Sequence, residues 1–358
     1  MMPDARAGAR GGRTRVGVNG FGRIGRNFLR ALFDRGEAAQ VELVALNDLT
    51  DAETNAHLLR YDTTQGRFPG EVAVESDAIV VAGRRVAVLA ERDPARLPWR
   101  DMGVDLVVES TGRFTTREAA ASHLEAGAAC VVISAPATGV DATFVVGVND
   151  AEFDPSRHFV ISNASCTTNC FVPMVKVLDE AFGVSNGLMT TVHAYTNDQN
   201  LLDLPHKDLR RARAAALNIV PSSTGAARAT GLVLPAMQGR LDGSSLRVPV
   251  GDGSITDFTA LVQGVRSTEE VNQAFYRAGA SGPLAGVLEY TEAPLVSSDV
   301  VGNPASCVFD ASLTMTMPVS EDATLVKVNG WYDNEWGYAN RLVDLLEIVA
   351  GSLARDPS

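Results

Sequence analysis

The segment Arg15-Val-Gly-Val-Asn19-Gly20-Phe-Gly22-Arg-Ile-Gly25 decides the fold of the N-terminal half of this chain. Its first residues form a short apolar run typical of a strand, and glycines with GxGxxG spacing follow at once. Residues 26–34 then place apolar side chains at helical spacing, which predicts a helix. Such glycines let the backbone approach a pyrophosphate, and the helix N-terminus supplies N–H donors to it. The segment therefore predicts the first strand–helix unit of a dinucleotide-binding domain.

Asp48 extends this prediction to the cofactor. It follows the apolar run 41–46, which is typical of a parallel strand covered on both faces. In dinucleotide-binding domains an acidic residue about 20 positions further on binds the ribose hydroxyls. A carboxylate at this place would also repel a 2′-phosphate, so Asp48 favours NAD over NADP. The competing interpretation is a structural turn followed by a solvated aspartate.

Strand and helix patterns alternate along the rest of the N-terminal half. Thr115 and Glu118 form a capping box that predicts a helix ending at Gly127. The runs 78–82 and 85–90 flank Gly83 and predict a hairpin. Further strands are predicted at 104–108, 129–133 and 143–148. The alternation predicts an α/β protein whose N-terminal domain is doubly wound and of the Rossmann type.

Longer β-rich runs begin after Cys166. They predict an α+β catalytic domain with a large mixed or antiparallel sheet. Between them lies a charged loop at 195–217. We expect a disordered tail over 1–14, an NAD-binding domain over 15–165 and 333–358, onto which the last helix packs back, and a catalytic domain over 166–332. The β-rich runs are 188–193, 246–250, 254–263, 307–317 and 324–332; Ser267 and Glu270 form a second capping box, and 339–349 is the last helix.

Length, charge and cysteine content exclude several classes of function. The 358 residues suffice for two domains, and no apolar run reaches the length of about 18 residues that predicts a membrane span. A net charge of −12 disfavours nucleic-acid binding, and any phosphate site must gather positive charge locally. Four cysteines without zinc-like spacing favour neither a disulfide scaffold nor a metal site, so we expect a reduced, cytoplasmic setting. Residues 1–15 lack the apolar core of a secretory signal.

Cys166 lies between an apolar strand at 159–161 and a helical stretch at 170–182. At such a junction backbone dipoles and a nearby imidazole depress the pKa of a thiol. Pro173 fits poorly inside a straight helix, so the helix either kinks or begins after Cys166. On position alone, the cysteine fits buried packing and nucleophilic catalysis equally.

His193 ends the β-rich run that begins at Leu188. A lone histidine is more often a structural residue than a catalyst, so position alone does not assign it a role. The other histidines are weaker candidates, because three lie in the cofactor half and one in the charged loop. They are His57, His123, His158 and His206.

Together these segments closely resemble the glyceraldehyde-3-phosphate dehydrogenase family over nearly the whole chain. The most specific motif is Ala164-Ser-Cys166-Thr-Thr-Asn-Cys170, which matches the family's active-site signature. The other matching segments are Val16 to Arg26, Glu109-Ser-Thr-Gly-Arg-Phe114, Ile133-Ser-Ala-Pro136, His193-Ala-Tyr-Thr-Asn-Asp198, Leu204-Pro-His-Lys-Asp-Leu-Arg-Arg-Ala-Arg213, Thr224-Gly-Ala-Ala227, Leu246-Arg-Val-Pro249 and Trp331-Tyr-Asp-Asn-Glu335.

The resemblance implies a phosphorylating, NAD-dependent oxidation of D-glyceraldehyde 3-phosphate to 1,3-bisphosphoglycerate, the glycolytic reaction. Cys166 would form a hemithioacetal and then a thioester, with His193 as base and no metal. The implied cofactor contacts are Asn19, Gly20, Gly22, Arg23, Ile24, Asp48, Arg92, Ser110, Thr111, Ser134 and Asn334. The implied contacts with substrate and inorganic phosphate are Ser165, Thr167, Thr196, Arg213, Thr224, Gly225 and Arg247, whose guanidinium and hydroxyl groups suit phosphate oxygens.

The resemblance also implies a homotetramer. The loop at 195–217 corresponds to the family's S-shaped loop, in which Leu204-Pro205 reaches toward a neighbouring subunit's adenosine pocket. Arg210 and Arg211 are interpreted as surface or interface charges. Two departures from the family pattern stand near the expected site: Val250-Gly-Asp252 replaces the usual residues after Pro249, and Trp336 stands where a smaller residue is frequent.

Three alternatives accompany this reading. Erythrose-4-phosphate dehydrogenase shares the cysteine and histidine but hydrolyses its thioester, whereas the hydroxyls of Ser165, Thr167 and Thr224 favour attack by phosphate. A catalytically silent NAD-binding or moonlighting interaction protein conflicts with the intact Cys166 and His193. Aspartate-semialdehyde dehydrogenase has the same two-domain plan but lacks the segment that begins at His193.

Overall fold

The computed structural model describes residues 12–264 and 266–353, which fall into two compact units. Unit 1 comprises Met1–Phe144, Asp150–Ala164 and Ala339–Ser358, and unit 2 comprises Val145–Asn149 and Ser165–Tyr338. Most of the predicted N-terminal tail lies outside the described residues. The predicted end of this tail, at residue 14, is wrong. Thr14 already belongs to the first strand, and the Arg13 guanidinium donates to the Glu37 carboxylate.

Unit 1 is a twisted sheet of mainly parallel strands with an antiparallel hairpin at one edge. The strand order is β10-β11-β9-β8-β1-β2-β7-β6-β5. The strands are β1 (Thr14–Asn19), β2 (Val41–Asn47), β5 (Val72–Glu75), β6 (Ala78–Val81), β7 (Arg84–Leu89), β8 (Leu106–Glu109), β9 (Cys130–Ile133), β10 (Ala142–Thr143) and β11 (Val160–Ser162); β3 (Tyr61–Asp62) and β4 (Gly66–Arg67) form a separate pair. The helices are α1 (Arg23–Arg35), α2 (Ala52–Arg60), α3 (Arg117–Ala120), α4 (Ser122–Glu125) and most of α8 (Trp336–Leu353).

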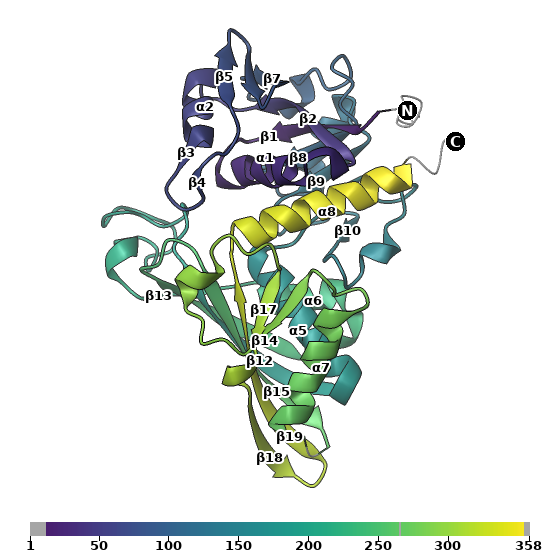
Figure 1. Cartoon of the computed structure of the whole chain (residues 1–358), viewed down its shortest axis with the longest axis vertical. Helices are drawn as coiled ribbons and strands as arrows, with labels where there is room; N and C mark the ends of the chain where they lie inside the picture. The colour runs from purple at the N-terminus through teal and green to yellow at the C-terminus, as the bar shows by residue number, and fades with distance from the viewer. Residues whose placement is uncertain (1–11, 265, 354–358) are drawn as a thin grey trace. The chain divides into compact units, whose positions relative to one another are not determined.

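Unit 2 is built on a mixed sheet with the order β13-β14-β12-β15-β19-β17-β16, to which β18 adds beside β19. Helices α5, α6 and α7 lie along the strands in Figure 1, and α5 packs through Phe171 onto Phe258 of β15. The strands are β12 (Val184–Ala194), β13 (Val220–Ser223), β14 (Leu241–Val248), β15 (Ser254–Gln263), β16 (Leu288–Thr291), β17 (Cys307–Asp310), β18 (Met315–Ser320) and β19 (Ala323–Tyr332). The helices are α5 (Cys166–Phe182), α6 (Ala226–Val233) and α7 (Thr268–Ala280); short 3-10 turns include η4 (Ala215–Leu217), η6 (Ser297–Val300) and η7 (Ala311–Leu313).

Several predicted elements differ from the observed ones. The helix predicted from Thr115 to Gly127 is two short helices, and Thr116 caps the first by accepting the Ala119 N–H. The strand predicted over 143–148 ends at Thr143, because the Asn149 side chain and Gly147, at φ +81°, turn the chain. The run 307–317 is broken where Asp310 caps η7.

The unit boundaries also differ from the predicted ones. Residues 333–338 belong to unit 2, because Asp333 accepts the Gly302 N–H and Asn334 accepts the Ser254 hydroxyl. Residues 145–149 belong to unit 2 as well, since Gly147 lies against Pro283. The capping box of Ser267 and Glu270 at the start of α7 is confirmed.

Candidate active site

The expected cofactor residues of unit 1 gather at the carboxyl ends of its parallel strands. Asn19 and Gly20 end β1, Asp48 follows β2, and Ser110 and Thr111 follow β8. Arg92 follows β7, and Ser134 follows β9. The carboxyl edge is where open α/β sheets bind their ligands. The fold therefore brings together residues that are more than 100 positions apart in the chain.

Gly20 and Asp48 shape the turn between β1 and α1. Gly20 has φ +94°, and a Cβ there would lie 2.7 Å from the Thr111 nitrogen, so only glycine fits. Asp48 accepts the Phe21 N–H at 2.8 Å and the Thr50 N–H at 2.9 Å. Gly22 is the N-cap of α1, and a Cβ there would meet open space. Among the described residues, no side chain caps this helix through a hydrogen bond at Gly22. The N-terminal N–H groups of α1 thus fit a dinucleotide pyrophosphate.

A buried polar layer beneath this turn escaped the sequence analysis. The Glu109 carboxylate accepts the Asn19 amide at 2.6 Å and the Thr111 N–H at 2.9 Å, and it lies 3.0 Å from His123 Nε2. The Trp99 indole donates to His123 Nδ1 at 3.0 Å. His123 therefore supports Asn19 and Thr111. The sequence showed Glu109 only as part of a family motif, because no spacing rule links it to His123, 14 residues later.

The remaining cofactor candidates of unit 1 lie at its surface or within this edge. Arg23, the first residue of α1, pairs with Asp62. Ile24 is half-buried, and Arg92 is exposed. The Ser134 N–H donates to the Glu109 carbonyl at 2.9 Å.

The candidate nucleophile of unit 2 is the first residue of α5. Ser165 caps this helix through an Oγ that accepts the Thr168 N–H at 3.0 Å. The helix therefore begins at Cys166 and runs through Pro173, so the prediction of a later start is wrong. Cys166 Sγ lies 3.5 Å from His193 Nε2. His193 Nδ1 lies 2.7 Å from the Ala194 carbonyl, which can only accept, so Nδ1 carries the proton and Nε2 faces the thiol with its lone pair.

Burial keeps both members of this pair neutral. It lowers the pKa of His193 to about 4, and Arg247 adds to the effect. Burial also raises the pKa of the Cys166 thiol, against Arg247 and the Thr167 N–H, while the partly exposed side chain lets solvent offset some of that penalty. The expected lowering of the thiol pKa is therefore wrong. A neutral imidazole facing a neutral thiol is poised to accept its proton when a carbonyl carbon is attacked.

Arg247 supplies positive charge beside this pair. Strand pairing sets Arg247 of β14 opposite His193 of β12. Its Nη1 donates to Thr196 Oγ1 at 2.6 Å and to the Ala194 carbonyl at 3.3 Å, and lies 4.0 Å from Asp198 Oδ1. Burial raises the pKa of Asp198, but the Thr196 hydroxyl and Arg247 outweigh it and hold that pKa below its usual range.

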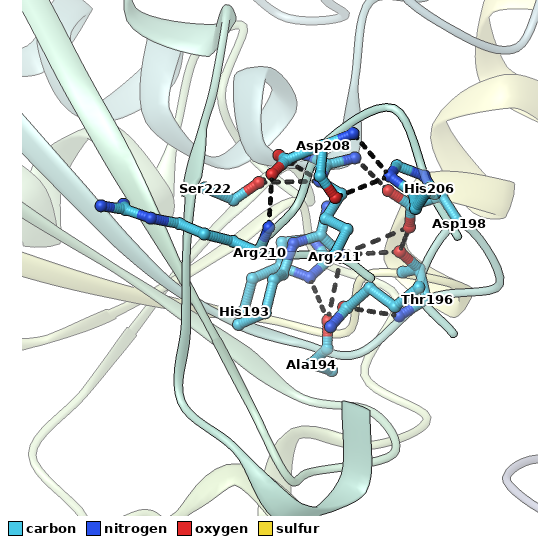
Figure 2. A network of polar contacts seen from close by, with 11 residues as sticks. His193, Ala194, Thr196, Asp198, His206, Asp208, Arg210, Arg211 and Ser222 are labelled. Carbon is cyan, nitrogen blue, oxygen red and sulfur yellow. Dashed lines mark hydrogen bonds and ion pairs between the residues drawn. The ribbon is translucent and has the colours of Figure 1, made fainter. Parts of the chain in front are cut away.

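Arg211 joins the same network, which Figure 2 shows. It pairs with Asp198 and donates to Ser222 Oγ at 2.6 Å, and its side chain is only 20% exposed. Of the two interpretations of Arg211, a surface or an interface charge, the solvated surface charge is therefore wrong. Asp198 contacts both Arg211 and Arg247, and so one carboxylate balances two neighbouring cations.

The other substrate candidates are spread over unit 2. The Thr167 hydroxyl lies 2.9 Å from the Tyr332 hydroxyl inside the unit. Thr224 Oγ1 accepts the Ala226 N–H at 3.2 Å, and Gly225 is the exposed N-cap of α6. Arg213 pairs instead with Asp203, and both side chains are largely exposed.

Asn334, the cofactor candidate of unit 2, is buried and held by a residue that sequence analysis missed. Ser254 Oγ donates to Asn334 Oδ1 at 2.7 Å and accepts the Ala194 N–H at 3.1 Å. Ser254 thus links Asn334 to the strand that ends in His193. Only the register of β12, β15 and β19 reveals this link.

No group of three or more His, Cys, Asp or Glu side chains among the described residues is arranged to hold a metal ion. No helix in residues 12–264 and 266–353 is long and apolar enough to cross a membrane.

Comparison with known proteins assigns both units. Residues 14–117 match the family model "Glyceraldehyde 3-phosphate dehydrogenase, NAD binding domain", and residues 165–334 match "Glyceraldehyde 3-phosphate dehydrogenase, C-terminal domain". The chain is 60% identical to glyceraldehyde-3-phosphate dehydrogenase 2 of Streptomyces arenae and 58% identical to the Streptomyces coelicolor glyceraldehyde-3-phosphate dehydrogenase, each over 95% of this chain and 99% of the relative. A Mycobacterium bovis glyceraldehyde-3-phosphate dehydrogenase is 58% identical over the same shares of both chains.

Proposed function

The chain belongs to the glyceraldehyde-3-phosphate dehydrogenase family, and from that premise we propose that Cys166 and His193 carry out its reaction. The reaction is the phosphorylating oxidation of glyceraldehyde 3-phosphate, with NAD as hydride acceptor. The observation that supports these roles is the 3.5 Å approach of the Cys166 sulfur to an unprotonated His193 Nε2.

In the first half-reaction His193 takes the thiol proton as Cys166 Sγ bonds to the aldehyde carbon, and then gives this proton to the oxyanion, which yields a neutral hemithioacetal and a neutral imidazole. His193 then accepts the hydroxyl proton while the hydrogen on carbon departs as hydride, which leaves a thioester on Cys166. The N–H groups at the start of α5 stabilise the oxyanion. NAD, when bound, supplies the hydride acceptor. Asn334, Asp48 and the turn at Gly20 would hold it.

In the second half-reaction inorganic phosphate attacks the thioester and releases an acyl phosphate. We assign one phosphate to Arg247 and Thr196, whose hydrogen bond already gathers a cation and a hydroxyl beside His193. The second anion position would use Ser165, Thr224, the Gly225 N–H and Arg213, with Thr167 lining it. Arg213 would have to leave Asp203 to contribute.

Steady-state kinetics test this assignment. We expect NADH to form from glyceraldehyde 3-phosphate only slowly without phosphate, and the rate to rise and saturate when phosphate is added. NADP should be a poor substitute for NAD. Phosphate-independent turnover, with erythrose 4-phosphate as the better substrate, would instead favour the hydrolytic relative considered above.

We also propose a cytoplasmic homotetramer. All four cysteines are free, which suits a reducing compartment. Leu201, Leu202 and Leu204 of the loop 195–217 are each more than 60% exposed, as is Leu188 on the sheet. A hollow of about 840 Å³ lined by β12, β15 and β19 adjoins Leu188. Exposed apolar surface of this extent is typical of subunit interfaces.

A further inference from the structure

The turn between β14 and β15 carries a buried carboxyl group for which the reaction gives no role. Asp252 is only 4% exposed and belongs to Val250-Gly-Asp252, the departure from the family pattern noted above. A buried carboxyl group must be either protonated or matched by donors, because a lone buried charge is costly. The Gly253 N–H is one donor, at 2.8 Å from Oδ1.

The second partner of Asp252 is another carboxyl group. Asp252 is hydrogen-bonded to Asp333, which is itself 1% exposed. The Asp333 carboxylate accepts three N–H groups: Gly302 at 2.7 Å on Oδ2, and Glu335 at 2.8 Å and Trp336 at 2.6 Å on Oδ1. N–H groups can only donate, so both oxygens of Asp333 already act as acceptors. The proton of the pair therefore resides on Asp252, which donates it to Asp333.

This pair holds the segment that contains Asn334. Asp333 and Asn334 are neighbours at the end of β19, where Ser254 pairs with Tyr332 in the sheet register. Asp252 binds Asp333 and Ser254 binds Asn334, so two hydrogen bonds from the start of β15 fix the same turn. The first requires a proton on Asp252, and the second does not.

We propose that Asp252 is a positioning residue, whose carboxylic O–H holds Asp333 and thereby keeps Asn334 placed for the cofactor, so that loss of this one proton at alkaline pH weakens cofactor binding and turnover. The proposal rests on the dehydrogenase function proposed above.

The charges around Asp252 set the sign of the effect. Burial, followed by Asp333 and Glu335, raises the pKa of Asp252 to about 8. The negative charge of an ionised Asp252 also raises the pKa of the Cys166 thiol, at the start of α5. Two further titratable groups lie near this turn. The Tyr195 hydroxyl lies beside Gly251. The turn η6 lies against Gly253 and carries Asp299, whose carboxylate accepts the Val296 N–H.

Below this pKa the carboxylic acid holds the turn. Above it, two buried carboxylates adjoin and repel each other, and the Cys166 thiol becomes harder to ionise. Both effects lower turnover as the pH rises, whereas thiol ionisation by itself would increase it. The folded-state pKa of Asp252 also lies above the unfolded value of about 3.9, so its contribution to stability is lost as the pH rises through about 8.

The variant Asp252→Asn separates these effects, because its amide still donates to Asp333 and does not titrate. We would measure kcat/KM for NAD, the Kd for NAD and the unfolding midpoint in urea from pH 6 to 10. The wild type should lose kcat/KM about tenfold for each pH unit above the midpoint of a single ionisation. The Asp252→Asn profile should keep its neutral-pH value within about threefold and shift its alkaline limb upward by at least one pH unit.

Asp299→Asn is the matched control, because Asp299 is a carboxyl group near the same turn that accepts the Val296 N–H. Its profile should coincide with that of the wild type. An unchanged alkaline limb in Asp252→Asn would overturn the proposal. If Asp252→Asn fails to fold, a wild-type Kd for NAD that does not weaken between pH 7 and 9 would overturn it as well. The unfolding midpoints test the carboxyl pair independently of the proposed function. One result would separate the two: the wild type shows no dehydrogenase activity, while its stability still falls near pH 8 and that of Asp252→Asn does not. That result would refute the proposed function but support the carboxyl pair.

Discussion

At the scale of single residues, the proposed mechanism depends on the contact between Cys166 and His193. Cys166→Ser should lower kcat by more than about 10³-fold, because a serine hydroxyl is a far weaker nucleophile than a thiol. The Kd for NAD should stay the same. Cofactor titration together with single-turnover kinetics measures both. A normal turnover rate in this variant would refute the assigned role.

His193→Asn should slow acylation by roughly 10²- to 10⁴-fold, the usual contribution of a general base. In the wild type, the low pKa of His193, about 4, keeps the imidazole unprotonated, so acylation should show no acid limb between pH 7 and 5. Stopped-flow measurement of NADH formation across this range tests the claim. His206→Asn, which alters a loop histidine bound to the Asp208 backbone, is the control and should leave acylation unchanged.

Asp48 carries the prediction about cofactor preference. Asp48→Ala should raise the KM for NAD about 10- to 100-fold, because a hydrogen bond to a charged group contributes roughly 1.5–3 kcal/mol. The KM for NADP should change little, so the preference narrows. Asp48→Asn keeps an acceptor for the Phe21 N–H and removes only the charge. An unchanged ratio of the two cofactors in both variants would count against the ribose contact.

Sequence reasoning proposed residues for ligand contact but missed the residues that support them. Asp48 lies in a motif whose spacing follows from its chemistry, whereas Cys166 and His193 were singled out by the resemblance of their segments to the family. Glu109, Ser254 and Asp252 act through hydrogen bonds that form only when distant strands pair. Arg211 shows the same limit: a run of arginines does not reveal which side chain turns inward to Asp198.

At the scale of elements, the start of α5 decides where the nucleophile lies. Pro173 argued for a kink or a later helix start, yet α5 begins at Cys166, directly after the Ser165 cap. Hydrophobic period predicted the strands of the buried sheets well. It failed at Val145–Asn149 and at η7, because side-chain caps and a left-handed glycine turn the chain there without any change in hydropathy.

The Ser165 cap gives a prediction at this scale. Ser165→Ala should lower the free energy of unfolding by about 1 kcal/mol, since the Thr168 N–H loses its acceptor. Ser165→Thr keeps an acceptor and should lose less. Urea unfolding of both variants measures the difference. Equal stability of Ser165→Ala and wild type would show that the N-terminus of α5 does not depend on this cap.

At the scale of the whole molecule, the sequence predicts two domains but not which surfaces remain exposed. On β12 the inward side chain of Met189 is buried, while Leu188 next to it is 69% exposed. The helices α5 and α6 contact the sheet of unit 2. The period of two along β12 therefore leaves an apolar side chain on the uncovered face of the sheet, and we propose that a second copy of the chain covers it.

Leu188→Asp tests that assembly. An aspartate on the exposed face would add a charge that subunits must desolvate when they meet, so the proposed tetramer should dissociate to dimers or monomers at micromolar concentration. Light scattering coupled to size-exclusion chromatography measures the mass. Tyr276→Ser is the control, because Tyr276 on α7 is also exposed, at 53%, but packs against Tyr290 away from this strand. A Leu188→Asp variant that stays tetrameric would move the interface to another surface, and the leucines of the loop 195–217 would be the next to change.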